Sequence, residues 1–235
     1  TLTAGYIYNV NRLVSEAAGP RGDDAMQTGI FNARYDGLSA GSLTAYSYLL
    51  DYDNLDASST SSYGLRFTGG TDLGEDVRAL YTLEYAQQSD YADNPDSFDT
   101  DYYLVEGGAS VSGVTLKLGQ EMLGSDEGQF AFQTPLATLH AMNGWTDRFV
   151  PGTPPNGLID SYVSAGGNAA GIKLMAIHHE FESDTADQDY GSETGVLAVR
   201  PLNETYTLGF KAASYSADDF SVDTDKAWVW VQASF

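Results

Sequence analysis

The feature that most constrains the fold is an alternation of apolar and polar residues that recurs along the whole chain. The clearest segment places on one parity the residues Val77, Ala79, Tyr81, Leu83 and Tyr85. Because successive side chains of a β-strand point to opposite faces, a period of two predicts strands with one apolar face. About twelve strands are expected, at residues 2–10, 28–35, 42–50, 63–68, 77–85, 103–111, 114–118, 158–165, 172–181, 195–199, 206–210 and 226–235.

The connections between these segments alternate between short turns and long loops. Short turns are expected at Asp36–Gly37, Gly69–Asp72, Ser112–Gly113, Gly166–Asn168 and Pro201–Asn203. The first long loop runs through Pro20 and Arg21, and acidic long loops follow at residues 51–60, 89–101, 182–193 and 216–225. An even strand number with long loops on one side predicts an all-β antiparallel transmembrane β-barrel. Soluble sandwiches usually have shorter strands and lack this alternation.

The composition agrees with one barrel domain over residues 1–235. No apolar run approaches the roughly 20 residues of a membrane-spanning helix. A formal charge of −22 argues against nucleic acid as a partner, and the absence of cysteine excludes thiolate chemistry. The chain opens inside a strand pattern at Thr1, so we expect that a signal peptide was removed or that more of the protein lies upstream.

The last ten residues, KAWVWVQASF, read as a membrane-facing strand. Val229 and Val231 lie on its apolar parity, and the sequence ends on Phe235. A strand of this kind resembles the signal that the outer-membrane assembly machinery recognises on bacterial β-barrels. The resemblance implies that Phe235, Val231 and Val229 serve as the membrane-assembly signal.

A second resemblance concerns the segment 132–144, FQTPLATLHAMNG, and its continuation through Trp145, Asp147 and Arg148. Together with Asn9–Arg12 and the C-terminal strand, it resembles the bacterial outer-membrane alginate export family, a porin-like group of barrels. The resemblance implies an outer-membrane conduit and a uronate-type polysaccharide as one candidate solute. Members of that family usually have more strands, which here would lie upstream of Thr1.

Most basic residues of the strands fall on the polar parity, which faces the lumen of a barrel. The expected lumen residues that would handle an anionic solute are Arg34, Arg66, Arg78, Lys117, Arg200 and Lys211. A ring of such charges would hold an anion by Coulomb attraction in a narrow pore. In the alternative, these bases pair with acids of neighbouring strands and stiffen the wall.

The long segment from about Gly124 to Asn156 carries too many apolar residues for a fully solvated loop. We therefore expect it to fold back and pack. Trp145, Asp147 and Arg148 are then candidates for a constriction, and a plain packing role is the alternative.

Enzymatic and metal-binding motifs are absent from the sequence. No Gly-x-Ser-x-Gly elbow or His-Glu-x-x-His pair occurs, and the adjacent His178 and His179 would point to opposite faces of a strand. The acidic loops, with Asp184 and Glu193 among their residues, lack the spacing of a calcium loop. No enzyme, cofactor or metal is expected.

The sequence therefore predicts a bacterial outer-membrane, porin-like channel for the passive passage of small hydrophilic or anionic solutes. Its expected partners are membrane lipid, lipopolysaccharide, the assembly machinery and the solute, and the oligomeric state stays open. The alternative from another class is a soluble or surface β-rich binding or adhesive protein with calcium-ordered acidic loops.

Overall fold

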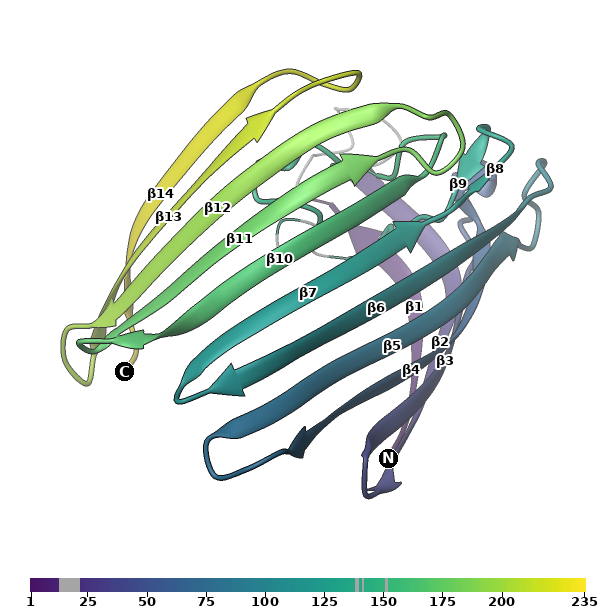
Figure 1. Ribbon diagram of the computed structural model, residues 1–235. Helices are drawn as coiled ribbons and strands as arrows, with labels where there is room; N and C mark the ends of the chain where they lie inside the picture. The colour runs from purple at the N-terminus through teal and green to yellow at the C-terminus, as the bar shows by residue number, and fades with distance from the viewer. Residues whose placement is uncertain (13–21, 138–139, 141, 151) are drawn as a thin grey trace. The chain divides into compact units, whose positions relative to one another are not determined.

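The structure is a computed structural model that describes residues 1–12, 22–137, 140, 142–150 and 152–235. Twelve strands form one sheet in the order in which they occur along the chain (Figure 1). They are β1 (Leu2–Asn11), β2 (Asp23–Leu38), β3 (Gly41–Leu50), β4 (Thr60–Asp72), β5 (Val77–Asp90), β6 (Asp99–Val111), β7 (Val114–Leu123), β10 (Leu158–Ala169), β11 (Ile172–Glu182), β12 (Asp189–Pro201), β13 (Tyr206–Ser216) and β14 (Thr224–Ala233). The short pair β8 (Ser125–Asp126) and β9 (Phe130–Ala131) forms a separate hairpin, and the turn η3 covers Asp56–Ser58.

The expected number of strands in the sheet is confirmed within the described chain, and every strand pair with a described register is antiparallel. No helix of the described residues is long and apolar enough to cross a membrane. Parts of two predicted loops lie outside the described residues: Pro20 and Arg21 of the first loop, and Thr138, Leu139, Ala141 and Pro151 of the long one.

The chain divides into two compact units. Unit 1 comprises residues 1–69 and 83–103, and unit 2 comprises residues 70–82 and 104–235. The boundary passes through β4, β5 and β6, so each of these strands contributes to both units.

Unit 1 has one apolar and one polar face, as the alternation predicts. Large apolar side chains stay exposed on the first face: Leu2, Tyr6, Tyr8, Phe31, Tyr35, Leu43, Tyr63, Leu65, Leu83 and Tyr85. The pairing register aligns them, because Leu2 is opposite Ala33, Ala33 opposite Ala45, and Ala45 opposite Leu65. A broad exposed apolar face of this kind is what lipid contact requires of a strand wall.

Unit 2 repeats the arrangement. Its exposed apolar side chains are Val105, Val111, Val114, Leu116, Leu118, Val163, Leu174, Val196, Tyr206, Leu208, Phe210, Val229 and Val231. One cross-strand row on this face reads Leu116, Ala165, Ala176, Val196, Ala212 and Ala227. The residues between them form the polar face, on which Lys117, Ser164 and Lys226 belong to a single row.

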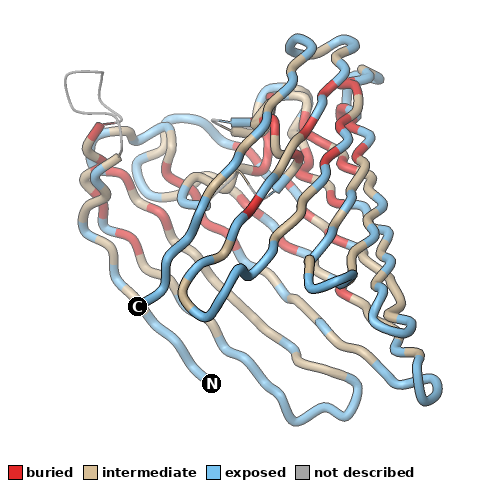
Figure 2. The backbone as a smooth tube through the Cα atoms, turned by 90° about the vertical axis from the view of Figure 1, so that its left-hand side faces the viewer, coloured by how far each residue is buried: buried red, intermediate tan, exposed pale blue. Residues whose placement is uncertain are grey.

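Buried residues gather near the ends of the strands that lead into the long connections (Figure 2). In unit 1, Met26, Leu50 and Tyr52 form such a cluster, with Ile7 and Tyr48 packed against it. In unit 2 the ring centroid of Phe149 lies 4.8 Å from that of Phe181 and 6.0 Å from that of Tyr190. The strand ends toward the short turns contain mostly exposed residues, as expected for a wall rather than a globular core.

Two of the short connections are two-residue turns with positive φ at both positions. Ser112 and Gly113 have φ of 49° and 84°, and Ala170 and Gly171 have 50° and 75°. This is the type I′ geometry that matches the twist of a hairpin. The turn expected at Ser112–Gly113 is confirmed.

Three predicted turns are wrong because their glycines lie inside strands. Asp36–Gly37 belongs to β2, Gly69–Asp72 to β4 and Gly166–Asn168 to β10. At Gly167 a Cβ would lie 3.2 Å from the carbonyl oxygen of Gly113, so this glycine accommodates a close neighbouring backbone. Glycine in a strand can mark such an approach as readily as a turn.

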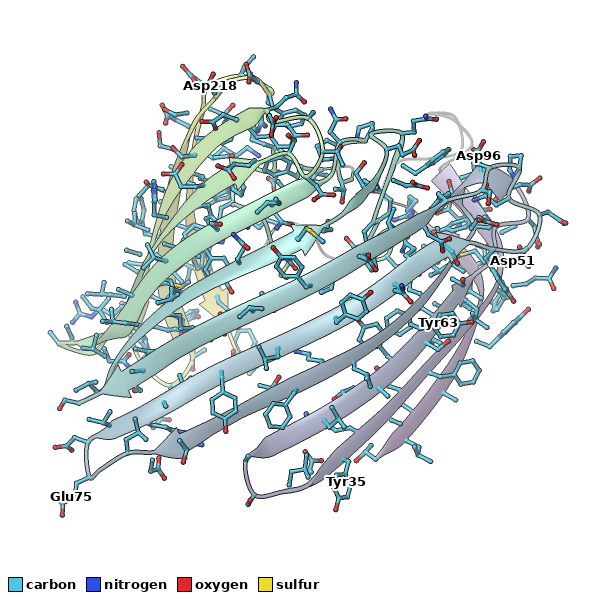
Figure 3. The ribbon with its side chains drawn as sticks, turned by 45° about the vertical axis from the view of Figure 1, so that its right-hand side comes forward. Tyr35, Asp51, Tyr63, Glu75, Asp96 and Asp218 are labelled. Atoms are coloured by element: carbon cyan, nitrogen blue, oxygen red, sulfur yellow. The ribbon has the colours of Figure 1, made fainter. Side chains whose placement is uncertain are left out.

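The acidic residues concentrate in the long connections (Figure 3). In unit 1, Asp51 follows β3 and Asp96 lies between β5 and β6. In unit 2, Asp218 lies between β13 and β14, while Glu75 lies in the short connection between β4 and β5. The large negative charge therefore comes chiefly from the ends of the strands.

Candidate functional site

The described residues of the segment 124–157 pack on the polar face of unit 2, as the sequence analysis expected, and Glu193 of β12 is their main anchor. One carboxylate oxygen of Glu193 accepts the backbone N–H of Trp145 at 2.5 Å. The other accepts the backbone N–H and the hydroxyl of Thr146 at 2.9 and 2.6 Å. Because Glu193 is only 1% exposed, these charge-assisted bonds satisfy a buried anion. The sequence analysis placed Glu193 in an acidic long loop, but the structure places it in β12, where its side chain is buried.

The strand beside this anchor leaves room for the indole of Trp145. A Cβ added to Gly195 would lie 2.7 Å from the Trp145 ring, so a larger residue could not occupy this position without displacing the ring. Glu193 and Gly195 share the polar parity of β12. The Glu-x-Gly sequence thus positions both the backbone and the side chain of Trp145.

Asp147 links the segment to the last strand. Its two oxygens contact Lys226 Nζ at 2.6 Å and His140 Nδ1 at 2.6 Å. Burial alone raises the pKa of the Asp147 carboxyl, but the hydrogen bonds to Lys226 and His140 outweigh burial and hold the pKa below its ordinary value of 3.8. Asp147 is therefore an ionised bridge between the segment and β14 at neutral pH.

A third attachment uses two carboxylates of adjacent strands. Glu121 and Asp160 are directly opposite in the register of β7 and β10, and both accept the side-chain amide of Asn143, at 2.8 and 3.1 Å. His179 lies 2.8 Å from the other oxygen of Asp160. An amide donor between two buried carboxylates offsets part of their mutual repulsion.

Phe149 adds an apolar attachment. Its ring stacks on Phe220 with centroids 5.3 Å apart and lies 4.8 Å from the ring of Phe181. Phe220 belongs to the connection between β13 and β14, which the sequence analysis described as an acidic long loop. Arg148, a predicted constriction residue, donates to the carbonyl oxygen of Thr146 at 3.1 and 3.2 Å.

Lys211 lies among aromatic side chains. Its ammonium is 4.5 Å from the ring centroid of Trp228 and 5.1 Å from that of Trp145. It also lies 2.5 Å from His140 Nε2. Asp147 and Glu193 act on it electrostatically, but no carboxylate of the described residues forms an ion pair with it.

Four other predicted lumen bases lie on the polar faces, each paired with an acid. Arg34 bonds Asp36 at 2.7 Å, Arg78 bonds Asp72 at 2.9 Å, and Lys117 bonds Glu106 at 2.8 Å. Arg66 forms an ion pair with Glu84. The alternative that the sequence left open, pairing with acids of neighbouring strands, describes Arg66, Arg78 and Lys117, whereas Arg34 pairs with Asp36 of its own strand β2.

The predicted lumen position of Arg200 is wrong. Arg200 is opposite Leu208, and Leu208 is opposite Val231, so the arginine belongs to the row of the apolar face. Both parities of β12 are apolar here, with Ala198 on one and Val199 on the other. The alternation could not distinguish the faces, and the pairing with β13 decides.

Glycines directly opposite aromatic residues recur on the polar faces. Gly64 is opposite Tyr46, Gly119 is opposite Tyr162, and Gly209 is opposite Trp230. In each pair a Cβ on the glycine would fall onto the aromatic ring. The rings therefore lie flat across the neighbouring strand, a relation that depends on register and that sequence reasoning missed.

The site has the features of a wall with a docked segment. His178 bonds Thr194 at 2.8 Å while His179 bonds Asp160, so the two histidines point apart as expected. The described residues contain no group of three or more His, Cys, Asp or Glu that could hold a metal ion. Val229 and Val231 lie exposed on the apolar face, and Phe235 is also exposed.

Comparison with solved structures identifies the fold. The outer membrane protein OprD from Pseudomonas aeruginosa matches with a TM-score of 0.68 and 12% identity, over 89% of this chain and 59% of that protein. Pseudomonas aeruginosa OpdL matches with a TM-score of 0.69 and 15% identity, over 100% of this chain and 68% of that protein. Acinetobacter baumannii OccAB4 matches with a TM-score of 0.68 and 11% identity, over 90% of this chain and 54% of that protein.

The chain has the fold of the outer-membrane β-barrel porins. It spans about three fifths of the length of OprD. The fold class and the outer-membrane location expected from the sequence agree with these neighbours. No protein-family model and no curated protein matches the chain, and the resemblance to the alginate export family stays a prediction.

Proposed function

We propose that this chain forms part of the wall of an outer-membrane channel for the passive passage of small hydrophilic solutes. The porin fold carries the proposal, and the docked segment on the polar face supports it. In this function the apolar faces contact lipid and lipopolysaccharide, and the polar faces line the pore. The resemblance of the last strand to an assembly signal, with Val229, Val231 and Phe235, remains part of the proposal.

A preference for anionic solutes is the finer proposal. It is supported by Lys211, whose ammonium has no carboxylate ion pair among the described residues and lies between two indole rings. Arg34, Arg66, Arg78 and Lys117 offer less, because each is paired. A uronate-type polysaccharide fits as a solute through its carboxylates.

Two experiments test the channel. Fractionation of cells should recover the protein only in detergent-solubilised outer membrane, and the purified protein should produce discrete conductance steps in planar bilayers. A monodisperse preparation without detergent would instead support the soluble binding or adhesive alternative. Addition of oligouronate to the bilayer chamber should interrupt the current in a concentration-dependent way, whereas a neutral oligosaccharide of equal length should interrupt it less.

A further inference from the structure

Two glutamates on the polar faces are held in the same way, by a tyrosine that reaches across a glycine. In unit 1 the Tyr46 hydroxyl donates to Glu84 at 2.7 Å, and Tyr46 is directly opposite Gly64. In unit 2 the Tyr162 hydroxyl donates to Glu106 at 2.8 Å, and Tyr162 is directly opposite Gly119. In each case the tyrosine and the glutamate belong to the two strands that flank the glycine strand.

The strand of each glycine also supplies a base, two residues away on the same face. Gly64 is followed by Leu65 and Arg66, and Lys117 precedes Leu118 and Gly119. Arg66 contacts one oxygen of Glu84 while Tyr46 contacts the other. Lys117 contacts Glu106 at 2.8 Å through the oxygen that Tyr162 leaves free. Both glutamates therefore divide their two oxygens between a phenol and a cation.

The exposed fractions show which partner a permeating ion would meet. The Glu84 and Glu106 side chains are 10% and 16% exposed, whereas those of Arg66 and Lys117 are 43% and 36% exposed. Each base is thus accessible from the polar face, and each carboxylate lies beneath it. Because each carboxylate lies directly beside its base, it offsets a large part of the potential of that base at distances well beyond their separation.

A third glycine and base occur with different partners. Gly209, Phe210 and Lys211 repeat the Gly-x-base spacing on β13, but Gly209 is opposite Trp230, which has no hydroxyl. Lys211 contacts His140 and two indoles in place of a carboxylate. The same local arrangement therefore exists twice with its base in a direct ion pair and once, at Lys211, without one among the described residues.

We propose that Glu84 and Glu106 are selectivity-determining residues that cancel Arg66 and Lys117, so that Lys211 is the base of these three that favours anions in the pore. This inference rests on the proposed channel function. The pairs Arg66–Glu84 and Lys117–Glu106 contribute little net preference in the native protein, and removal of one partner exposes the charge of the other.

Reversal potentials in planar bilayers test the inference with full-length protein. Glu84→Gln, and separately Glu106→Gln, should raise the anion-to-cation permeability ratio by about threefold at 10 mM salt, where the Debye length is about 30 Å. Lys211→Gln should lower the ratio. The double variant Arg66→Gln with Glu84→Gln should restore the wild-type ratio. All shifts should disappear at about 1 M salt, where the Debye length is about 3 Å.

Glu75→Gln is the matched control, because it removes the same charge from an exposed glutamate in the short connection between β4 and β5. It should shift the ratio by much less than Glu84→Gln or Glu106→Gln does. The inference is overturned if Glu84→Gln and Glu106→Gln both give the wild-type ratio, or if the double variant behaves like Arg66→Gln alone. Heat-shifted migration in detergent gels verifies that each variant folds, and the two units provide independent tests should one variant fail. Absence of conductance from the wild-type protein would contradict the channel itself, a result distinct from unchanged selectivity in an open channel.

Discussion

Glu193 of β12 accepts both the backbone N–H and the hydroxyl of Thr146, and so fixes the segment 124–157 to the strand wall. Glu193→Gln keeps the shape of the side chain but replaces one acceptor oxygen with an NH₂ group, which faces backbone N–H donors and cannot accept from them. Loss of a hydrogen bond to a charged group costs about 2 kcal/mol, so the population of undocked segment should rise about 30-fold. Limited proteolysis of the detergent-solubilised protein measures this as faster cleavage within 124–157.

Glu180→Gln is the control for this variant. Glu180 is exposed on β11 and contacts only His178 among the interactions identified for it. Its substitution should leave the cleavage rate unchanged. Equal cleavage of the wild-type protein and Glu193→Gln would mean that Phe149 and Asn143 hold the segment without the carboxylate.

The aromatic–glycine pairs make a prediction about stability. Gly64→Ala would place its Cβ in the ring of Tyr46, and the displaced ring would lose its bond to Glu84. Overpacking of this kind typically costs 1 to 3 kcal/mol, so we expect a loss of about 2 kcal/mol in urea unfolding from detergent. Gly107→Ala is the matched control on β6, since nothing lies within 4 Å of its added Cβ. Equal stability of the two variants would contradict the packing role of Gly64.

The strand pattern could be predicted from sequence because it depends on local alternation. Val77 to Tyr85 and Ala227 to Ala233 alternate cleanly, and both lie in strands of the predicted kind. Strand ends were harder to predict. Gly37 and Gly167 look like turn residues, yet Gly37 lies at an irregularity within β2, and Gly167 lies in β10 where a neighbouring backbone approaches closely. Glycine permits a turn without requiring one.

The site was less predictable because its contacts depend on register and on long-range docking. The sequence suggests that Asp147 and Trp145 pack inward, but Lys226 is 79 residues from Asp147 and Glu193 is 48 from Trp145. No local period encodes such pairs. Arg200 shows the same limit, since its face follows from Leu208 on the next strand.

Arg200 on the apolar face has its own test. Charged residues on the lipid face of a barrel cost about 0 to 1 kcal/mol near the interface, so Arg200→Leu should leave stability unchanged or raise it by up to about 1 kcal/mol. Reversal potential should not change, because the side chain does not line the polar face. Arg66→Gln serves as the comparison, with an expected shift toward cations. A shift of the same size in Arg200→Leu would contradict the register of β12 and β13.

Asp147 connects docking of the segment to pH. Its carboxyl has a pKa below the ordinary value of 3.8, chiefly because the hydrogen bonds to Lys226 and His140 outweigh the opposing effect of burial. A carboxyl with a lowered pKa in the folded state stabilises that state fully above its ordinary pKa. That contribution is lost as pH falls through the lowered value. This group should therefore leave docking constant down to about pH 5 and weaken it below about pH 4.

Asp51 has the opposite sign and provides a contrast. Its pKa is raised by burial and by the neighbouring Asp53, Asp93 and Asp56, so its contribution to stability is greatest at low pH and is lost as pH rises.

Indole fluorescence can follow the docking transition, because Trp145 and Trp228 both lie beside Lys211 and near the Asp147 bridge. Asp147→Asn should abolish the fluorescence change below pH 4, while Asp51→Asn should retain it. If Asp147→Asn keeps the full acid transition, the bridge to Lys226 does not control docking.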